Sequence, residues 1–319
     1  MKKLWDVGLY YGTHYLRNRK IESIGSRTYY DNLKAYAGKP VLSACDANLF
    51  IGERLREGAP VCIGRFGASE LFCASMFEFN IKGKKAKSLE QLSDWSGFFP
   101  KDVPLGEKFN DVIKAGIKEV DLLGIWNLRY DDYYIIKYAN SQICLTYLYS
   151  LEPWTCPENA WTSALAGKKV LVIHPFEESI KMQYKKRSLI FPGTNILPDF
   201  ELKTLKAVQT LAGQKDKRFN SWFDALDWMF AEAMKTDFDT ALIGCGAYGL
   251  PLAAKLKAAG KQAVHLGGAT QILFGIKGKR WDEEADKQYV RNFYNDSWVY
   301  PLSLEKPENA DIVENGCYW

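Results

Sequence analysis

The sequence predicts a single large α/β domain with a Rossmann-like, mostly parallel sheet and helices on both faces. Three observations lead to this prediction. Short apolar runs bounded by turn residues alternate with segments of helical periodicity between residues 61 and 266, as in sheets of parallel strands. A glycine-rich turn joins one such run to the following helix at residues 243–249. The 319 residues, 47% hydrophobic and 25% charged, have the composition of a globular protein and show no internal repeat.

The individual elements follow from the spacing of the apolar residues. Strands are expected at residues 61–64, 122–126, 169–174, 240–243 and 262–266. Helices are expected at residues 43–58, 68–79, 105–120, 131–139, 221–235 and 250–259. Residues 81–104, rich in lysine and aromatic residues, are interpreted as a long surface excursion. Because ligands of such sheets bind beyond the carboxyl ends of the strands, the residues that follow each strand are the first candidates for a site.

The two ends of the chain differ from this alternating middle. Residues 1–40 form a basic and aromatic arm, and residues 41–319 form the α/β domain, with residues 281–319 wrapped over its body. Charged and glycine residues interrupt the apolar run of the arm, which excludes a signal peptide. No stretch approaches the roughly 18 apolar residues of a membrane span. We expect a cytoplasmic protein whose arm packs on the body; peripheral contact with the inner face of a membrane is the alternative.

Charge and cysteine content exclude further classes. The 42 Lys and Arg residues against 38 Asp and Glu residues give a net charge of +4, too balanced to indicate a nucleic-acid partner. The 7 cysteines are odd in number and contain no CxxC spacing. This pattern argues against structural zinc and against a disulfide framework, and favours a reducing compartment. Aromatic residues make up 14% of the chain, which suits a thick core or flat sugar and base surfaces.

The glycine-rich turn is the sharpest local motif. Residues 243–249, Ile-Gly-Cys-Gly-Ala-Tyr-Gly, fit the GxGxxG pattern through Gly244, Gly246 and Gly249. Glycines let the backbone approach a ligand closely, and a helix N-terminus favours a phosphate. A nicotinamide site usually carries an acid about 20 residues later, whereas the next strand here ends at His265. We predict a phosphate-bearing ligand; a nicotinamide cofactor and simple strand–helix packing are the alternatives.

Other polar residues stand at the ends of two further predicted strands. Arg65 is followed by Gly67 and, one helical turn later, by Glu70. This pair is suited to a ligand phosphate and a sugar hydroxyl, or to an ion pair of its own. His174 also ends a strand, where an imidazole can donate to a phosphate or transfer a proton, a structural role being the alternative.

The segment after His265 supplies the last candidates. Gly267 and Gly268 lead from a strand into a helical stretch, so their amides offer a second anion site. Arg280 belongs to a basic run that is suited to closing over a diphosphate, with a solvated surface as the alternative. No metal ligand is assigned, because the chain contains no HExxH motif and its three histidines are widely spaced.

These motifs together resemble the GT-D-fold glycosyltransferases of bacterial surface-polysaccharide synthesis. The resemblance covers roughly residues 60–319 and rests on Arg65-Phe66-Gly67 with Glu70, His174-Pro175-Phe176, residues 243–249, and His265-Leu266-Gly267-Gly268. It implies a Rossmann-like domain that transfers a sugar from a nucleoside-diphosphate sugar to an acceptor hydroxyl. Members of the family continue the RFG stretch as Asp-any-Glu, whereas this chain has Ala68 at the position of the Asp. The departure leaves open both the metal, Mg²⁺ or Mn²⁺ with the diphosphate, and the activity itself.

The leading hypothesis is therefore a glycosyltransferase that uses a UDP-linked sugar and a glycan or lipid-linked acceptor. The glycines at positions 244, 246 and 249 would lie near the phosphates, Arg65 and His174 would neutralise them, and Glu70 would contact the sugar or accept the acceptor's proton. A nicotinamide-dependent oxidoreductase is a second hypothesis, supported only by the glycine pattern. A third is a non-catalytic nucleotide-sugar-binding or scaffold protein, which Ala68 favours.

Overall fold

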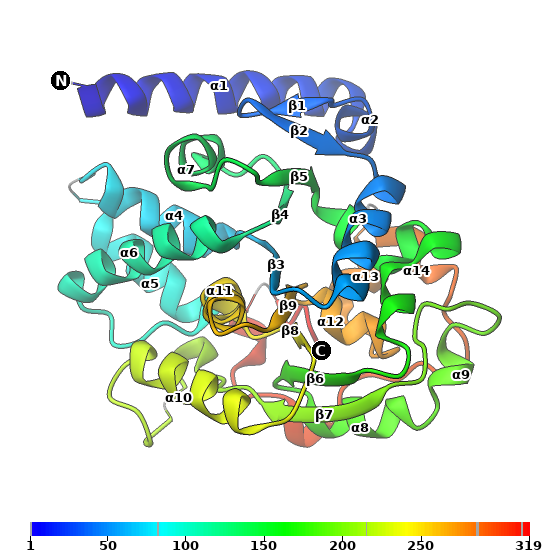
Figure 1. Cartoon of the computed structure of the whole chain (residues 1–319). Coiled ribbons are helices and arrows are strands. Elements are labelled where there is room, and N and C mark those ends of the chain that lie inside the picture. The colour runs from blue at the N-terminus through cyan, green and yellow to red at the C-terminus, as the bar shows by residue number, and fades with distance from the viewer. Residues whose placement is uncertain (1, 82, 215, 285–286, 314) are drawn as a thin grey trace.

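The computed structural model describes residues 2–81, 83–214, 216–284, 287–313 and 315–319, and within them nine strands form one sheet (Figure 1). The strand order is β1-β2-β5-β4-β3-β9-β8-β6-β7, and neighbouring strands are parallel except β1 and β2. The strands are β1 Ala35–Tyr36, β2 Lys39–Leu42, β3 Val61–Arg65, β4 Leu122–Ile125, β5 Cys144–Tyr147, β6 Lys169–His174, β7 Glu201–Lys206, β8 Thr240–Ile243 and β9 Gln262–His265. The predicted fold class, a mostly parallel α/β sheet, is confirmed.

Helices cover both faces of this sheet (Figure 1). They are α1 Lys2–Ile24, α2 Ser26–Asp31, α3 Ala44–Glu57, α4 Ala68–Glu78, α5 Lys85–Ser96, α6 Val103–Glu119, α7 Asp131–Tyr138, α8 Glu177–Tyr184, α9 Arg187–Ile190, α10 Trp222–Lys235, α11 Gly249–Ala258, α12 Ala269–Leu273, α13 Lys279–Glu283 and α14 Gln288–Arg291. In β8, Ala241 and Ile243 belong to the core under α4, α6, α10 and α11, whereas Leu242 belongs to the core under α3, α8 and α12. Every position of this strand is buried, and its last three residues are apolar because both its faces are covered.

All the predicted strands and helices are present, with boundaries shifted by a few residues at most. The interpretation of residues 81–104 as a surface excursion is wrong, because this stretch contains α5, whose Leu89 and Leu92 are buried. Lys82, within the same stretch, lies outside the described residues. Strands β1, β2, β5 and β7 were not predicted. β7, with the sequence ELKTLK, lies at the sheet edge and is mostly half-buried, so it lacks a continuous apolar run.

The expected N-terminal arm, residues 1–40, consists from residue 2 onward of α1, α2, β1 and the start of β2. Helix α1 lies along the edge of the molecule and packs on α7 (Figure 1). The ring of Tyr10 meets that of Tyr133 edge-on at 5.2 Å, and Arg17 pairs with Asp132 at 2.8 Å. The outer side of the helix leaves Trp5 80% exposed. None of the described helices combines the length and the apolarity needed to cross a bilayer.

Cys45 in α3 and Cys156 form a disulfide across a sequence separation of 111 residues. The prediction that the chain carries no disulfide is therefore wrong. The pairing joins two segments that only the fold brings together, so no local spacing could indicate it. Cys62, Cys73, Cys144, Cys245 and Cys317 are free thiols.

The described parts of the closing segment, residues 281–319, pack over the body and reach the carboxyl edge of the sheet. The amide of Lys277 donates to Val299 O at 2.7 Å, and Ile276 and Val299 form a parallel bridge. Farther along, Glu305 accepts the amide of Glu178 at the start of α8 at 2.8 Å. Residues 315–319 then return to the strand ends, where they form one wall of the main cavity.

Candidate functional site

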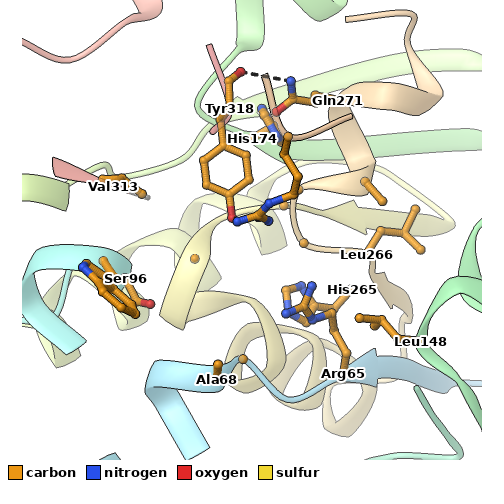
Figure 2. Close-up of a pocket in the computed structure, with 18 of the residues that line it drawn as sticks. Arg65, Ala68, Ser96, Leu148, His174, His265, Leu266, Gln271, Val313 and Tyr318 are labelled. Carbon is orange, nitrogen blue, oxygen red and sulfur yellow. Dashed lines mark hydrogen bonds between the residues drawn. The ribbon is translucent and has the colours of Figure 1, made fainter. Parts of the chain in front are cut away.

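A cavity of about 420 Å³ lies beyond the carboxyl ends of the central strands (Figure 2). The register explains its lining. Ile63 of β3 pairs with Val264 of β9, Ile243 of β8 pairs with His265, and Ile173 of β6 pairs with Ile243. The residues that follow these pairs therefore emerge side by side at one edge of the sheet, the usual place for a ligand in an α/β fold.

Most of the residues predicted from the sequence line this single cavity. They come from four strand ends and from α13, and comprise Arg65, Gly67, Glu70, His174, Gly244, Gly246, His265, Gly267, Gly268 and Arg280. Gly249 does not line it. Aromatic side chains complete the wall, among them Trp95, Trp126, Tyr147, Phe176, Trp281, Tyr318 and Trp319.

Arg65, the last residue of β3, is a half-buried cation that forms no ion pair within the part of the chain that the structure describes, although Glu70 and Glu152 act on it at longer range. Its Nε donates to Phe66 O at 3.3 Å, and its guanidinium lies 5.1 Å from the centre of the Trp126 ring. Burial lowers the pKa of Arg65. The alternative of an Arg65–Glu70 ion pair is wrong. Since a buried charge is costly unless it is paired, this guanidinium is suited to an anionic ligand.

Glu70 lies in the first turn of α4 and folds back over Gly67. A Cβ atom at Gly67 would lie 1.9 Å from Glu70 Oε2, so only glycine leaves room for the carboxylate. The hydroxyl of Ser69 donates to the same oxygen at 3.0 Å and lies 2.6 Å from the hydroxyl of Ser96. Gly67 therefore serves the placement of Glu70, which is fixed at the cavity wall.

His174, at the end of β6, is a buried neutral imidazole. Its Nδ1 accepts the amide of Phe176 at 3.0 Å, so the ring proton is on Nε2. Burial lowers the pKa of His174 to about 3. The expectation that this side chain neutralises phosphates as a cation is therefore wrong at neutral pH. What His174 can offer a ligand is the uncharged Nε2–H donor.

His265, at the end of β9, has the opposite tautomer. Its Nδ1 lies 3.2 Å from Ile243 O and donates to it, which leaves Nε2 as an acceptor. Burial and, to a lesser degree, the charge of Arg65 lower the pKa of His265 to about 3. Gly249 lies against this ring, because a Cβ there would be 2.0 Å from His265 Cε1. Gly249 thus makes room for the imidazole rather than contacting a ligand.

The glycine turn packs closely, and some of its amide N–H groups are already hydrogen-bonded within the protein. The N–H of Gly244 donates to Ile173 O at 3.0 Å, and that of Gly267 donates to Ile243 O at 3.3 Å. A Cβ at Gly244 would lie 2.6 Å from His174 Cδ2. These two glycines therefore position the strand ends and the imidazole, and of the predicted anion-binding amides those of Gly246 and Gly268 are left to face a ligand.

The closing segment is docked onto the cavity wall around Arg280. The guanidinium of Arg280 donates to Tyr318 Oη at 3.4 Å and to Cys317 Sγ at 3.2 Å, and its Nε lies 3.6 Å from Glu284. The carbonyl of Tyr318 accepts from Gln271 Nε2 at 3.1 Å (Figure 2). Arg280 is thus a cation held in place by the protein, with its other side toward the cavity.

Glu152 lines the cavity but was not predicted from the sequence. It follows β5, itself unpredicted, and is only 6% exposed. Trp154 Nε1 donates to its carboxylate at 3.0 Å, and the hydroxyl of Tyr289 donates as well. Burial raises the pKa of Glu152. The only sequence feature that could have indicated Glu152 is its position shortly after the short strand β5.

Three buried polar atoms of the cavity wall have no hydrogen-bond partner among the described residues: Gln271 Oε1, Trp281 Nε1 and Trp319 Nε1. Buried polar groups are usually paired, so such a cluster indicates a place where a ligand or water completes the bonds. Apart from the high aromatic content, no feature of the sequence indicated these atoms.

The cavity residues do not form a ready-made site for a divalent cation. In the described part of the chain, one group of His, Cys, Asp and Glu ligands is close enough to hold a metal, namely Cys45, Cys156 and Glu158, and its two sulfurs are bonded to each other. Glu70 and Glu152 belong to no such group, and Ala68 offers no carboxylate. We therefore derive no step through Mg²⁺ or Mn²⁺.

Comparison with known proteins adds little to this description. No family model matches the chain, and no curated protein matches its sequence. Two solved structures are similar with a TM-score of 0.44, each covering 84% of this chain and 93% of its own. One, 13% identical, is the domain of unknown function 1792, described as having a distinct glycosyltransferase fold; the other, 12% identical, is a selenomethionine-substituted structure of that domain.

Proposed function

We propose that this protein is a glycosyltransferase that takes a nucleoside-diphosphate sugar in the 420 Å³ cavity. The observation that carries the proposal is Arg65, a half-buried guanidinium without an ion pair to a protein carboxylate, facing a cavity that falls within the roughly 300–1,000 Å³ of small-molecule sites. A diphosphate supplies the missing negative charge, and the aromatic wall suits a base and a sugar ring. The choice of UDP and a role in surface-polysaccharide synthesis rest on the family resemblance of the sequence.

In the proposed reaction, a hydroxyl oxygen of the acceptor forms a bond to the anomeric carbon of the donor sugar. The bond from that carbon to the diphosphate oxygen breaks, and its electron pair leaves with UDP. The hydroxyl proton passes to the carboxylate of Glu70, which lines the cavity from α4.

Charge that develops on the leaving diphosphate requires donors already in place. Arg65 and Arg280 supply positive charge from opposite sides of the strand edge, one from β3 and one from α13. His174 supplies a neutral Nε2–H donor whose direction is fixed by the amide of Phe176. Because the protein orients these groups before the reaction, little reorganisation accompanies bond breaking.

A second candidate function is favoured by Ala68. This residue lines the cavity where the related sequence motif carries an acid, and it contributes only a methyl group. A protein of this kind would bind the nucleotide sugar without transferring it, and act as a scaffold for other enzymes. Binding without hydrolysis or transfer, across many acceptors, would distinguish it from the enzyme.

The test is a panel of UDP- and GDP-linked sugars, assayed by thermal shift and by release of the nucleoside diphosphate with glycan and lipid-linked acceptors. We expect stabilisation by at least one UDP compound, and turnover that Glu70→Gln reduces by about a hundredfold or more without a change in melting temperature. Glu90→Gln, an exposed carboxylate on α5, is the matched control. Absence of stabilisation by every compound contradicts the proposal, and full activity of Glu70→Gln removes Glu70 from the mechanism.

We also propose that the outer face of α1 contacts a membrane surface. Trp5, Leu9 and Leu16 are 80%, 59% and 68% exposed on one side of the helix, with the exposed Arg19 and Lys20 beside them. Aromatic and basic side chains on one helix face favour an anionic lipid surface. Cosedimentation with phosphatidylglycerol vesicles should fall severalfold in a Trp5→Ser, Leu16→Ser variant, and unchanged binding would contradict this contact.

A further inference from the structure

A second cavity, of about 350 Å³, adjoins the one described above. It lies among α1, α4, α5 and the loop that follows β4. Its lining residues are His14, Ala68, Phe72, Gln91, Asn127, Leu128 and Arg129. Ala68 also lines the 420 Å³ cavity, so the two spaces meet at a residue whose side chain is one exposed methyl group.

The loop after β4 divides the two cavities. Trp126 faces the first cavity, where it lies under the guanidinium of Arg65. Asn127 and Arg129 face the second. Asn127 has a left-handed backbone with φ of 54°, an uncommon conformation for a residue other than glycine. Hydrogen bonds from Arg17 Nε to Asn127 Oδ1 at 2.7 Å and from Asn127 Nδ2 to Asn18 Oδ1 at 2.6 Å hold it there.

These bonds set the proton position on His14. Because Asn18 uses Oδ1 to accept from Asn127, its Nδ2 is the atom that faces His14, and it donates to Nε2 at 3.1 Å. The neutral ring then carries its proton on Nδ1. Burial, followed by the charges of Arg129 and Arg17, lowers the pKa of His14, against an opposing effect of Asp132.

Two donors of this second cavity are left without acceptors. His14 Nδ1 and Arg129 Nε are buried and have no hydrogen-bond partner among the described residues. Arg129 makes no ion pair within the described chain either; its guanidinium lies 4.9 Å from the centre of the Tyr11 ring. None of the described residues that line this cavity is acidic, and Asp132 acts on His14 from outside the lining. A guanidinium without an ion pair and an unpaired N–H suit an anion with several acceptor oxygens.

We infer that this second cavity is the acceptor subsite, and that it takes a phosphate-bearing acceptor through Arg129 and His14. The inference rests on the proposed transfer reaction and adds the chemical class of the acceptor. A hydroxyl of the bound acceptor reaches the donor sugar past Ala68, where the two cavities meet and where Glu70 follows two residues later on α4. The small side chain at position 68 then leaves a passage open between the two cavities.

The experiment first measures UDP binding to the full chain by calorimetry, and then titrates the UDP-saturated protein with farnesyl diphosphate or with glucose 1-phosphate. Arg129→Gln is compared with Arg54→Gln, an exposed arginine of α3 that lines neither cavity. We expect a second binding event that Arg129→Gln weakens by about tenfold or more and Arg54→Gln leaves unchanged. UDP binding and melting temperature should be the same in both variants.

The two phosphate compounds separate the sources of the acceptor. Binding of farnesyl diphosphate alone supports a lipid-linked acceptor, and binding of both compounds supports recognition of the phosphate itself. If UDP binds but neither compound does, or if Arg129→Gln binds both as wild type does, the subsite is overturned while the donor site stands. If UDP fails to bind but Arg129-dependent binding persists, the second cavity is an anion site and the proposed donor function fails.

Ala68→Leu provides an independent variant of the junction. We expect it to retain UDP binding and farnesyl diphosphate binding, measured separately, while transfer falls by about tenfold or more because the larger side chain closes the passage. Ala86→Leu on α5, a position that lines neither cavity, is the control for added bulk. Unchanged transfer by Ala68→Leu would overturn the passage at this residue.

Discussion

Two half-buried arginines near the same loop show what separates a structural cation from a functional one. Arg17 on α1 donates from Nη1 to Asp132 at 2.8 Å and from Nε to Asn127 at 2.7 Å. Burial alone would lower the pKa of Arg17, but Tyr36 and the carboxylates of Asp132 and Asp131 outweigh it and raise the pKa. Arg65 on β3 forms no ion pair, and burial lowers its pKa because it outweighs the longer-range attraction of Tyr318, Glu70 and Glu152.

The difference is one of charge balance inside the protein. Around Arg17 the acids needed for neutrality belong to the chain, so the cluster fixes α1 to α7. Around Arg65 no acid of the chain is close enough to form an ion pair, although this side chain is half-buried as well. A buried ion without a partner costs several kcal/mol, which the fold accepts where a ligand completes the balance. Arg129, which also forms no ion pair within the described chain, resembles Arg65 in this respect.

The largest predicted effect comes from breaking the ion-pair cluster of Arg17, Asp131 and Asp132. Arg17→Gln leaves Asp132 buried without its cation and should lower the free energy of unfolding by about 3 kcal/mol. Arg65→Gln removes a charge that has no ion-pair partner and should leave the free energy of unfolding unchanged or raise it. Urea unfolding of both variants checks the contrast. Equal losses in the two would contradict it.

The next effect concerns His174, the neutral donor of the cavity. His174→Ala removes the Nε2–H and should lower kcat by about a hundredfold, the usual loss for one donor to a developing charge. His174→Gln, which keeps an N–H donor, should recover part of this loss. Since the pKa of His174 is about 3, its contribution should not titrate between pH 5 and 8. A kcat that falls to zero as a group near pH 6.5 loses its proton would show that His174 acts as a cation instead.

The two buried imidazoles also predict a dependence of stability on pH. His174 and His265 have pKa values lowered from 6.5 to about 3 in the folded protein. Between these values the unfolded chain binds protons that the native protein does not, so stability rises with pH across the window and falls on acidification. Each histidine contributes a slope of about 1.4 kcal/mol per pH unit.

The double variant His174→Gln, His265→Gln isolates this contribution, because all other titrating groups are shared with wild type. Its free energy of unfolding between pH 6 and 4.5 should fall less steeply than that of wild type, measured by urea titration at each pH. Parallel curves for the two proteins would mean that the imidazoles are protonated in the native state.

The smallest predicted effect concerns the ring of Trp126, which lies under the guanidinium of Arg65. Trp126→Leu removes the aromatic face 5.1 Å from Arg65 and should weaken UDP binding by a factor of about five, as expected for a partly buried cation–π contact. Trp228→Leu removes a similar contact at 4.6 Å from the exposed Arg218, outside the cavity, and should leave binding unchanged. Equal affinities of both variants for UDP would show that Trp126 does not support Arg65.

Much of the fold and the position of the site follow from local sequence. The buried strands are apolar runs in the sequence. Because parallel strands place the residues that follow them at one edge of the sheet, Arg65, His174 and His265 could be predicted to lie together. Edge strands such as β7 were not predicted because their outer positions are polar. Helix α5 was not predicted because lysines precede its few buried residues.

The chemical state of the site could not be predicted in the same way. The tautomers of His174 and His265 depend on the amide of Phe176 and the carbonyl of Ile243, contacts that sequence spacing does not show. The glycine pattern suggested bare amides, whereas Gly249 instead makes room for an imidazole. Glu152 and the disulfide depend on contacts between distant segments, which only the folded chain brings together.

The most direct measurement of the central claim is calorimetric titration of UDP and of uridine into wild type and Arg65→Gln. If Arg65 balances a diphosphate, wild type should bind UDP at least about a hundredfold more tightly than uridine, and Arg65→Gln should bind the two within about tenfold of each other. An undiminished preference for UDP in Arg65→Gln, or the absence of UDP binding to wild type, would contradict the account.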